Sequence, residues 1–134
     1  MKNTELIDIF LNSYQGNKAK TKSLFFEDNI LYSYGYHYPL CIKLTDHKFI
    51  INNRGYSMTT STHTNHLIRA IAGTNANLKE VEKNKQDYPN IILMNTEQIK
   101  KFIDYCRMNN LIMNINELAL MELEKEEKTL TPYI

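Results

Sequence analysis

The sequence predicts a small α+β protein in which three or four helices pack on one face of a small antiparallel sheet. Short apolar runs separated by turn residues fill residues 24–60, which is typical of a meander of three or four strands. Apolar residues at helical spacing lie on both sides of that stretch and predict the helices. A chain of 134 residues has the length of a single domain, so residues 1–134 are expected to fold as one unit.

The first helix is expected over residues 4–14, where Asn3 or Thr4 can cap its free N–H groups. The apolar side chains expected to face the core are Leu6, Ile9 and Phe10. Alternating lysines follow within residues 15–22, and this polar stretch is expected to form a loop or an exposed edge.

Turn residues divide the expected sheet into short strands. A first turn is expected at residues 27–29 and a second at residues 45–47. Asn and Gly within residues 52–55 tolerate positive φ and predict a third turn. The later strands expected around these turns are residues 40–44, 48–52 and 56–60.

The apolar period changes from that of a strand to that of a helix after this sheet. A helix is expected over residues 61–72, capped by Ser61 or Thr62 and ended by Gly73 at the C′ position. Residues 74–90 are polar and are expected to form a long connection that contains one helical turn.

Residues 91–94 are expected to form a short buried strand. Asn95 and Gln98 then have the spacing of a capping box, which predicts a helix that runs to about Met108. The side chains of this helix expected to face the core are Ile99, Phe102, Ile103 and Cys106. Residues 114–134 are expected to form a charged C-terminal helix and tail.

The net charge of +1 gives no general attraction to nucleic acid or to a membrane. It also excludes a DNA mimic, because such a protein needs a strong negative excess. The charge is uneven along the chain, since residues 117–134 contain five glutamates and two lysines. The rest of the chain is therefore mildly basic and its C-terminal end is acidic.

Two cysteines, Cys41 and Cys106, cannot build a disulfide framework, and they form no CxxC motif. Both are expected to be reduced, packed thiols. The chain has no signal-like start and no apolar run of about 18 residues, so a cytoplasmic protein without a membrane partner is expected.

Tyrosine occupies every second position from 32 to 38, within the segment LYSYGYHYPL. Alternate side chains of a strand share a face, so the four rings are expected to lie on one face of the sheet. Three interpretations stay open: rings packed under a helix, a platform on which unpaired bases stack, and a patch that binds protein. Pro39 ends this strand or places it at an edge. The four residues are Tyr32, Tyr34, Tyr36 and Tyr38.

Three cationic side chains lie close to the tyrosines in the sequence, namely Lys43, Lys48 and Arg54. Cations beside stacking rings contact phosphates and make binding sensitive to salt. Together with the four tyrosines, they are the residues expected to contact single-stranded RNA or a protein partner.

The segment MTTSTHTNH places hydroxyls and two histidines where a helix is expected to begin. A helix N-terminus presents free N–H groups and a positive dipole end, so it receives anions. The residues expected to receive an anion are Thr60, Ser61, Thr62, His63 and His66. Simple capping is the alternative, and it uses only one or two of the hydroxyls.

The histidines also support an enzymatic alternative. His63 and His66 share a helix face, and with His37 they can supply a general acid and base for cleaving RNA or a cyclic oligonucleotide. No HExxH or CxxC motif accompanies them, so no metal and no cofactor is expected.

Two stretches resemble a phage-borne family of small proteins without an assigned activity. The pattern is Tyr-Gly-x-His-aromatic-Pro-Leu, followed by Tyr-Ser-x-Thr-Thr-Ser-x-His. The matching residues are Tyr34, Gly35, His37, Tyr38, Pro39 and Leu40, then Tyr56, Ser57, Thr59, Thr60, Ser61 and His63. The resemblance covers about residues 30–72.

This resemblance, the small size and an Asn-, Lys- and Ile-rich composition imply a phage accessory or anti-defence protein in the cytoplasm of an infected bacterium. The first expectation is a non-enzymatic protein that binds RNA, a host type III CRISPR–Cas complex, or both, and so inhibits immunity as anti-CRISPR proteins do. The alternatives are the small nuclease or phosphodiesterase named above and a pure protein–protein interaction module. The oligomeric state stays open, with a dimer among the options.

Overall fold

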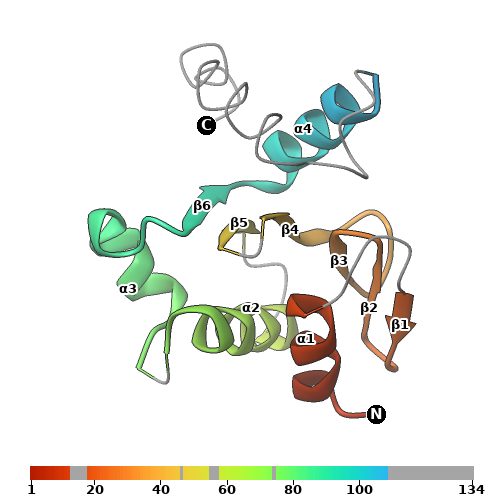
Figure 1. Ribbon diagram of the computed structural model, residues 1–134, viewed down its shortest axis with the longest axis horizontal. Coiled ribbons are helices and arrows are strands. Elements are labelled where there is room, and N and C mark those ends of the chain that lie inside the picture. The colour runs from red at the N-terminus through yellow and green to blue at the C-terminus, as the bar shows by residue number, and fades with distance from the viewer. Residues whose placement is uncertain (13–17, 46, 55–57, 74, 109–134) are drawn as a thin grey trace.

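The computed structural model describes residues 1–12, 18–45, 47–54, 58–73 and 75–108, which form four α-helices, a short 3₁₀ helix and a six-stranded sheet (Figure 1). The elements in chain order are α1 (Asn3–Leu11), β1 (Lys18–Lys20), β2 (Leu24–Glu27), β3 (Ile30–Ser33), β4 (Pro39–Thr45), β5 (Lys48–Asn52), α2 (Met58–Ala72), α3 (Leu78–Lys83), η1 (Lys85–Asp87), β6 (Ile91–Met94) and α4 (Thr96–Met108). The predicted α+β class is confirmed.

The sheet is larger than expected and is mixed. Its strands follow one another in the order β1-β2-β3-β4-β5-β6, and the first five are antiparallel neighbours. β6 pairs in parallel with β5, from Phe49 opposite Ile91 to Asn52 opposite Met94. A parallel neighbour requires a crossover, which α2 and α3 supply. The predicted meander is therefore correct for β2 to β5. β6 confirms the strand expected over residues 91–94, although its place beside β5 was not expected, and β1 lies in the stretch expected to form a loop or an exposed edge.

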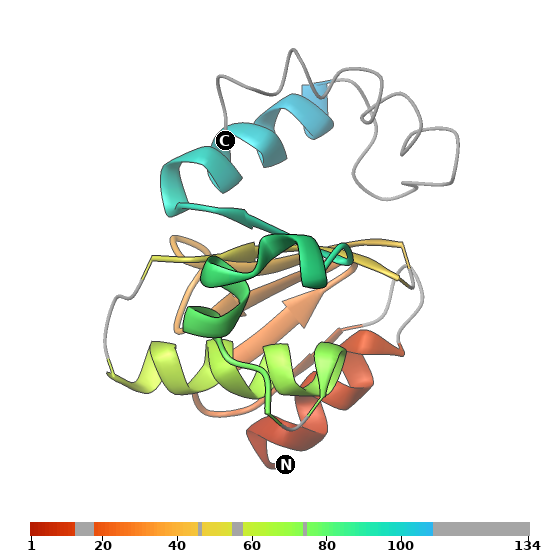
Figure 2. The same ribbon diagram turned by 90° about the vertical axis from the view of Figure 1, so that its left-hand side faces the viewer.

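Helices cover both faces of the sheet, and the expectation that they lie on one face is wrong (Figure 2). α1 and α2 lie on one face and α4 lies on the other. The reason is the sequence of β5. Neighbouring side chains of a strand point to opposite faces of the sheet, and β5 has apolar side chains on both faces. Ile51 packs in the core beneath α1 and α2, and Ile50 packs in the core beneath α4. A sheet with two apolar faces needs a helical cover on each.

Helix α1 packs through Leu6, Ile7 and Phe10. Ile9 was expected in the core, but its side chain is 41% exposed. The N-cap residue is Lys2, which makes no side-chain capping bond. Asn3 was an expected cap, but its side chain bonds to the loop between β1 and β2 and to α2 instead.

Helix α4 begins and packs as predicted. The backbone N–H of Asn95 donates to Gln98 Oε1, and the N–H of Gln98 donates to Asn95 Oδ1, each at 2.8 Å. This capping box satisfies two N–H groups that would otherwise lack a partner at the helix start. The predicted core residues of the helix are all buried, namely Ile99, Phe102, Ile103 and Cys106.

Helix α2 begins earlier than expected, at Met58, so residues 58–60 are helical and not part of a strand. Its end is as predicted, since Gly73 follows the last residue with φ +113°, a conformation that L residues rarely adopt. The predicted helical turn in the connection to β6 is α3. Other predicted features lie at least partly outside the described residues. They are the end of the helix over residues 4–14, the turns at residues 45–47 and 52–55, the start of the strand at residues 56–60, and the helix and tail over residues 114–134.

Both cysteines are buried free thiols, on opposite faces of the sheet. Burial raises the pKa of Cys106 to about 12 and also raises the pKa of Cys41, so both stay protonated near neutral pH. This confirms them as packed thiols. Among the described residues, no helix combines the length and the hydropathy that crossing a bilayer requires.

Candidate functional site

The tyrosine segment forms a hairpin turn and not a single strand. β3 ends at Ser33 and β4 begins at Pro39, and the N–H of Ser33 donates to the carbonyl of Tyr38 at 3.1 Å. Tyr34 has φ +65°, in the left-handed region, which reverses the chain directly after the strand. The predicted placement of four rings on one face is therefore wrong, because the two-residue period of a strand stops at Ser33.

The turn sends the tyrosines to different places. Tyr32 and Tyr38 are buried on opposite faces of the sheet, where burial raises the pKa of each hydroxyl. The Tyr38 hydroxyl also donates to the backbone carbonyl of Arg54. Tyr34 and Tyr36 are exposed, by 57% and 62%. The core interpretation is thus correct for two of the rings, and two remain available to a partner.

Tyr36 belongs to a compact aromatic cluster on the α4 face. The ring centroids of Phe25 and Tyr32 are 5.0 Å apart and nearly parallel, and Tyr36 meets them edge-on at 5.0 and 5.1 Å. The Tyr36 hydroxyl donates to Glu27 Oε1 at 2.5 Å, and this bond raises the pKa of that hydroxyl. Tyr36 is therefore an exposed ring that is held in one orientation by its neighbours.

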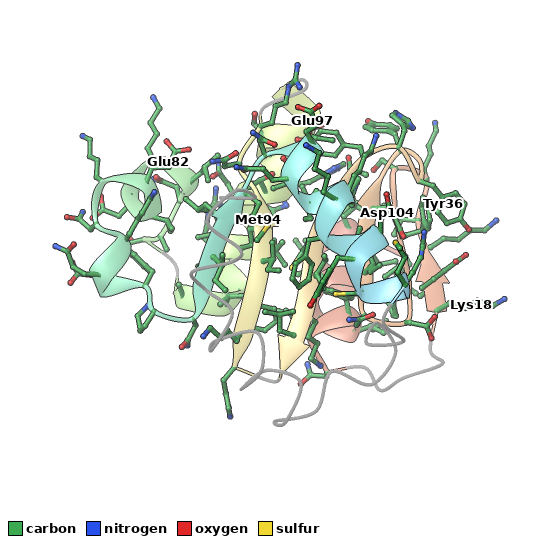
Figure 3. All side chains as sticks on the ribbon, turned by 90° about the horizontal axis from the view of Figure 1, so that it is seen from above. Lys18, Tyr36, Glu82, Met94, Glu97 and Asp104 are labelled. Atoms are coloured by element: carbon green, nitrogen blue, oxygen red, sulfur yellow. The ribbon has the colours of Figure 1, made fainter. Side chains whose placement is uncertain are left out.

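An open groove of about 490 Å³ lies between this cluster and the edge strand β1. We call it the β1 groove, and its lining residues are Lys18, Ala19, Lys20, Phe25, Phe26, Glu27 and Tyr36. Lys18 pairs with Glu27 and Lys20 with Phe25, so both lysines project to the face that carries Phe25. Figure 3 shows Lys18 and Tyr36 on the same side of α4. The groove thus combines two exposed cations with an exposed aromatic ring.

Sequence reasoning did not select Lys18, Lys20 or Phe25 as site residues. The signal was present in the alternating lysines of KAK, which were expected to form a loop or an exposed edge. β1 is indeed an edge strand. Only the register with β2, however, places the two lysines beside the aromatic cluster.

Two of the three cations expected at the site lie elsewhere. Lys43 is buried, and its Nζ donates to the carbonyl of Leu11 at 2.6 Å, so it caps the C-terminal end of α1 and does not face solvent. Lys48 pairs with Thr45, at the end of the β4–β5 ladder that is remote from the tyrosine turn. Arg54 is exposed and follows β5 at the same end as the turn.

The residues expected to receive an anion are divided between surface and interior. Ser61 and Thr62 are exposed, whereas Thr60 and His63 are buried. His66 is partly buried, and its buried Nδ1 has no hydrogen-bond partner among the residues that the structure describes. Because α2 begins at Met58, its free N–H groups belong to residues before Thr62, and the expected cluster is not gathered at one helix end.

His63 is the centre of a partly buried polar cluster that joins four parts of the fold. Its Nδ1 lies 3.1 Å from Ser33 Oγ, and its Nε2 lies 3.2 Å from Asn3 Nδ2 and 3.4 Å from Ser23 Oγ. Thr21 Oγ1 donates to Asn3 Oδ1 at 2.6 Å. We call these five residues the polar seam, because they tie α1, the β1–β2 loop, β3 and α2 together.

The polar seam gives no support to the enzymatic alternative that uses the histidines. Burial is the main reason that the pKa of His63 is lowered, with His66 as a second cause, so the ring is neutral near pH 7. Both ring nitrogens already face protein partners, and a general base must reach its substrate. His37 is exposed in the tyrosine turn. Within the described residues, no group of three His, Cys, Asp or Glu side chains is arranged to hold a metal.

Acidification is expected to destabilise the protein through His63. Burial keeps the pKa of His63 below its unfolded value of about 6.5, so between these two values the unfolded chain binds more protons. The stability that buried, neutral His63 contributes is complete when the pH is above the pKa of His63 in the unfolded chain. It is lost as the pH falls through the pKa of His63 in the folded protein. Urea unfolding measures the free energy of unfolding at pH 7.5 and at pH 5. Between these two pH values His63→Gln should lose less of this free energy than the wild type does, and the control His47→Gln, at an exposed position, should lose as much as the wild type. Equal losses in all three proteins would contradict this role.

Comparison with known families gives one match. Residues 6–88 match the family of unknown function DUF8033, and the chain belongs to this family. The matched range includes β1 to β5, α2 and α3, and so the whole β1 groove, but it ends before β6 and α4. No curated protein and no solved structure matches the chain.

Proposed function

We propose that this DUF8033 member is a non-enzymatic protein that binds single-stranded RNA in the β1 groove. The observation that carries the proposal is the exposed ring of Tyr36, held against Phe25 and facing the same groove as Lys18 and Lys20. Unpaired bases stack on such rings, and lysines beside them contact the phosphates.

The groove favours a single strand over a duplex. Bases in a duplex are stacked on one another and leave no face for a protein ring, whereas unpaired bases can turn onto an aromatic side chain. Only one ring of the cluster is widely exposed, since Tyr32 is buried and Phe25 is partly buried. We therefore expect one base on Tyr36 and neighbouring phosphates on the two lysines.

Glu27 places a negative charge in the same groove, but the positive charges of the two lysines exceed it. One of its carboxylate oxygens accepts the hydrogen bond of Tyr36. Two lysines line the groove with it, so its charged side chains are mostly cationic. Glu27 thus orients the ring while the lysines attract the strand.

The proposal is tested by removing the two lysine charges from the groove. Full-length wild type, Lys18→Gln/Lys20→Gln and the control Lys79→Gln/Lys83→Gln are titrated into a fluorescent 12-residue oligouridylate at several salt concentrations. The control lysines are exposed on α3, and Figure 3 shows this helix, with Glu82, on the side away from Lys18. Loss of two phosphate contacts should weaken binding and reduce the slope of log affinity against log salt by about 1.4.

Two outcomes of the same experiment contradict the proposal. The first is a wild type that leaves the oligonucleotide unbound at the lowest salt concentration. The second is an equal slope in the groove variant and the control. Electrophoresis of the recovered oligonucleotide, with and without a divalent metal, checks the enzymatic alternative, because cleavage would favour a nuclease over a binding protein.

We further propose that this binding serves to inhibit a host type III CRISPR–Cas complex. This part rests on the resemblance to phage proteins and on size and composition, not on a particular residue. The test is a pull-down with the tagged protein from cells that contain such a complex, with and without ribonuclease. Copurification that ribonuclease abolishes supports RNA-mediated capture, copurification that survives it favours the protein–protein alternative, and its absence overturns the proposal.

A further inference from the structure

The described chain ends beside the β1 groove. α4 ends at Met108, and the guanidinium of Arg107 lies close enough to the Tyr32 hydroxyl to lower its pKa against the larger effect of burial. The ring of Tyr32 lies 5.1 Å from that of Tyr36, which lines the groove. Met108 is exposed, so the chain leaves α4 at the surface and next to the aromatic cluster.

The charge of the remaining chain is complementary to the groove. Residues 117–134 contain five glutamates and two lysines, in a protein whose net charge is +1. The glutamates are Glu117, Glu122, Glu124, Glu126 and Glu127. A glutamate carboxylate presents to Lys18 and Lys20 the same kind of anionic oxygen that a phosphate presents.

A short linker separates the end of α4 from the first of these glutamates. Residues 109–116 separate Met108 from Glu117, and an extended chain of that length spans up to about 28 Å. A segment tethered so close has an effective concentration in the millimolar range, so even weak ion pairs occupy the site.

We propose that the acidic C-terminal segment, residues 117–134, binds in the β1 groove of its own chain and competes there with RNA. The inference rests on the proposed function, because it assigns a competitor to the same groove. Binding of the segment in the groove makes the protein autoinhibited at low salt. Only RNA strands that displace the segment then bind. Both the segment and RNA are held there by the charges of Lys18 and Lys20.

Carbodiimide cross-linking of the full-length protein tests the contact without any RNA. The reagent adds no spacer, so it joins a carboxylate to an amine only where the two groups come into direct contact, and mass spectrometry identifies the joined peptides. We expect Lys18 or Lys20 to be joined to a glutamate of residues 117–127, and high salt to abolish the product. A mixture of isotope-labelled and unlabelled protein identifies the chain of origin. Products between two chains, or none at these lysines, overturn the proposal.

A charge-matched pair of variants tests the competition. Glu126→Gln/Glu127→Gln removes two charges from the segment, and Glu82→Gln/Glu97→Gln removes two exposed charges that Figure 3 shows away from Lys18. The segment variant should bind oligouridylate about 2- to 10-fold tighter than the control at low salt. Equal affinities overturn autoinhibition while leaving RNA binding intact. If no variant binds RNA, the proposed function fails, and the cross-links still decide whether the segment occupies the groove.

Discussion

Replacing Phe102 by alanine is expected to lower the free energy of unfolding by about 3–5 kcal/mol. Phe102 is 2% exposed and lies in the core between α4 and the sheet, with Ile42 and Ile50 among its neighbours in that cluster. Truncation removes most of the side chain from this core and leaves a cavity that the rigid sheet cannot close. Denaturant unfolding followed by circular dichroism measures the change.

Lys101→Ala is the matched control, because Lys101 precedes Phe102 in α4 and is exposed. Its effect should stay within about 0.5 kcal/mol. The match to DUF8033 ends at residue 88, and α4 begins after it. The two variants therefore test whether a helix outside the matched range is part of the core. A loss below about 1 kcal/mol for Phe102→Ala would mean that α4 is not an integral part of the core.

Features that depend on neighbouring residues in the chain were predictable from the sequence. The capping box of Asn95 and Gln98 specifies the start of α4, and the hydrogen bonds of the structure are those that the motif requires. Gly73 ends α2 for a similarly local reason, because few other residues adopt its φ. The turn between β2 and β3 follows from Asp28 and Asn29 in the same way, and Asp28 has φ +55°.

Features that depend on pairing between distant segments were not predictable. β6 lies beside β5 only because α2 and α3 return the chain to that edge, and an apolar run such as IILM does not specify its neighbour. The two-faced burial of the sheet was missed for a related reason. Lys43 made β4 resemble a strand with one solvent face, whereas its amine reaches the carbonyl of Leu11 in α1.

The candidate site shows the same division between local and distant information. The aromatic residues were visible as a pattern, but the left-handed φ of Tyr34 breaks the alternation that the pattern predicts. His63 was visible as part of a helix face. Its partners Asn3, Ser23 and Ser33 come from three separate segments, so its burial could not be inferred from spacing.

Replacing Tyr36 by alanine is expected to weaken oligouridylate binding by about 5- to 150-fold, which corresponds to about 1–3 kcal/mol for one stacked base. The ring is exposed and is oriented by Phe25 and by the hydrogen bond to Glu27, so it needs little ordering when a base arrives. Fluorescence anisotropy of the labelled oligonucleotide measures the loss, and circular dichroism checks that the variant is folded.

Two further tyrosine variants decide whether the effect comes from stacking at this position. Tyr36→Phe keeps the ring and loses the bond to Glu27, so we expect its affinity to stay within about 3-fold of the wild type. Tyr34→Ala removes a ring of similar exposure that lies 6.0 Å from His63, on the side of α2, and should leave binding unchanged. A Tyr36→Phe variant as weak as Tyr36→Ala would assign the contact to the hydroxyl. An equal loss in Tyr34→Ala would show that the strand is not confined to the β1 groove.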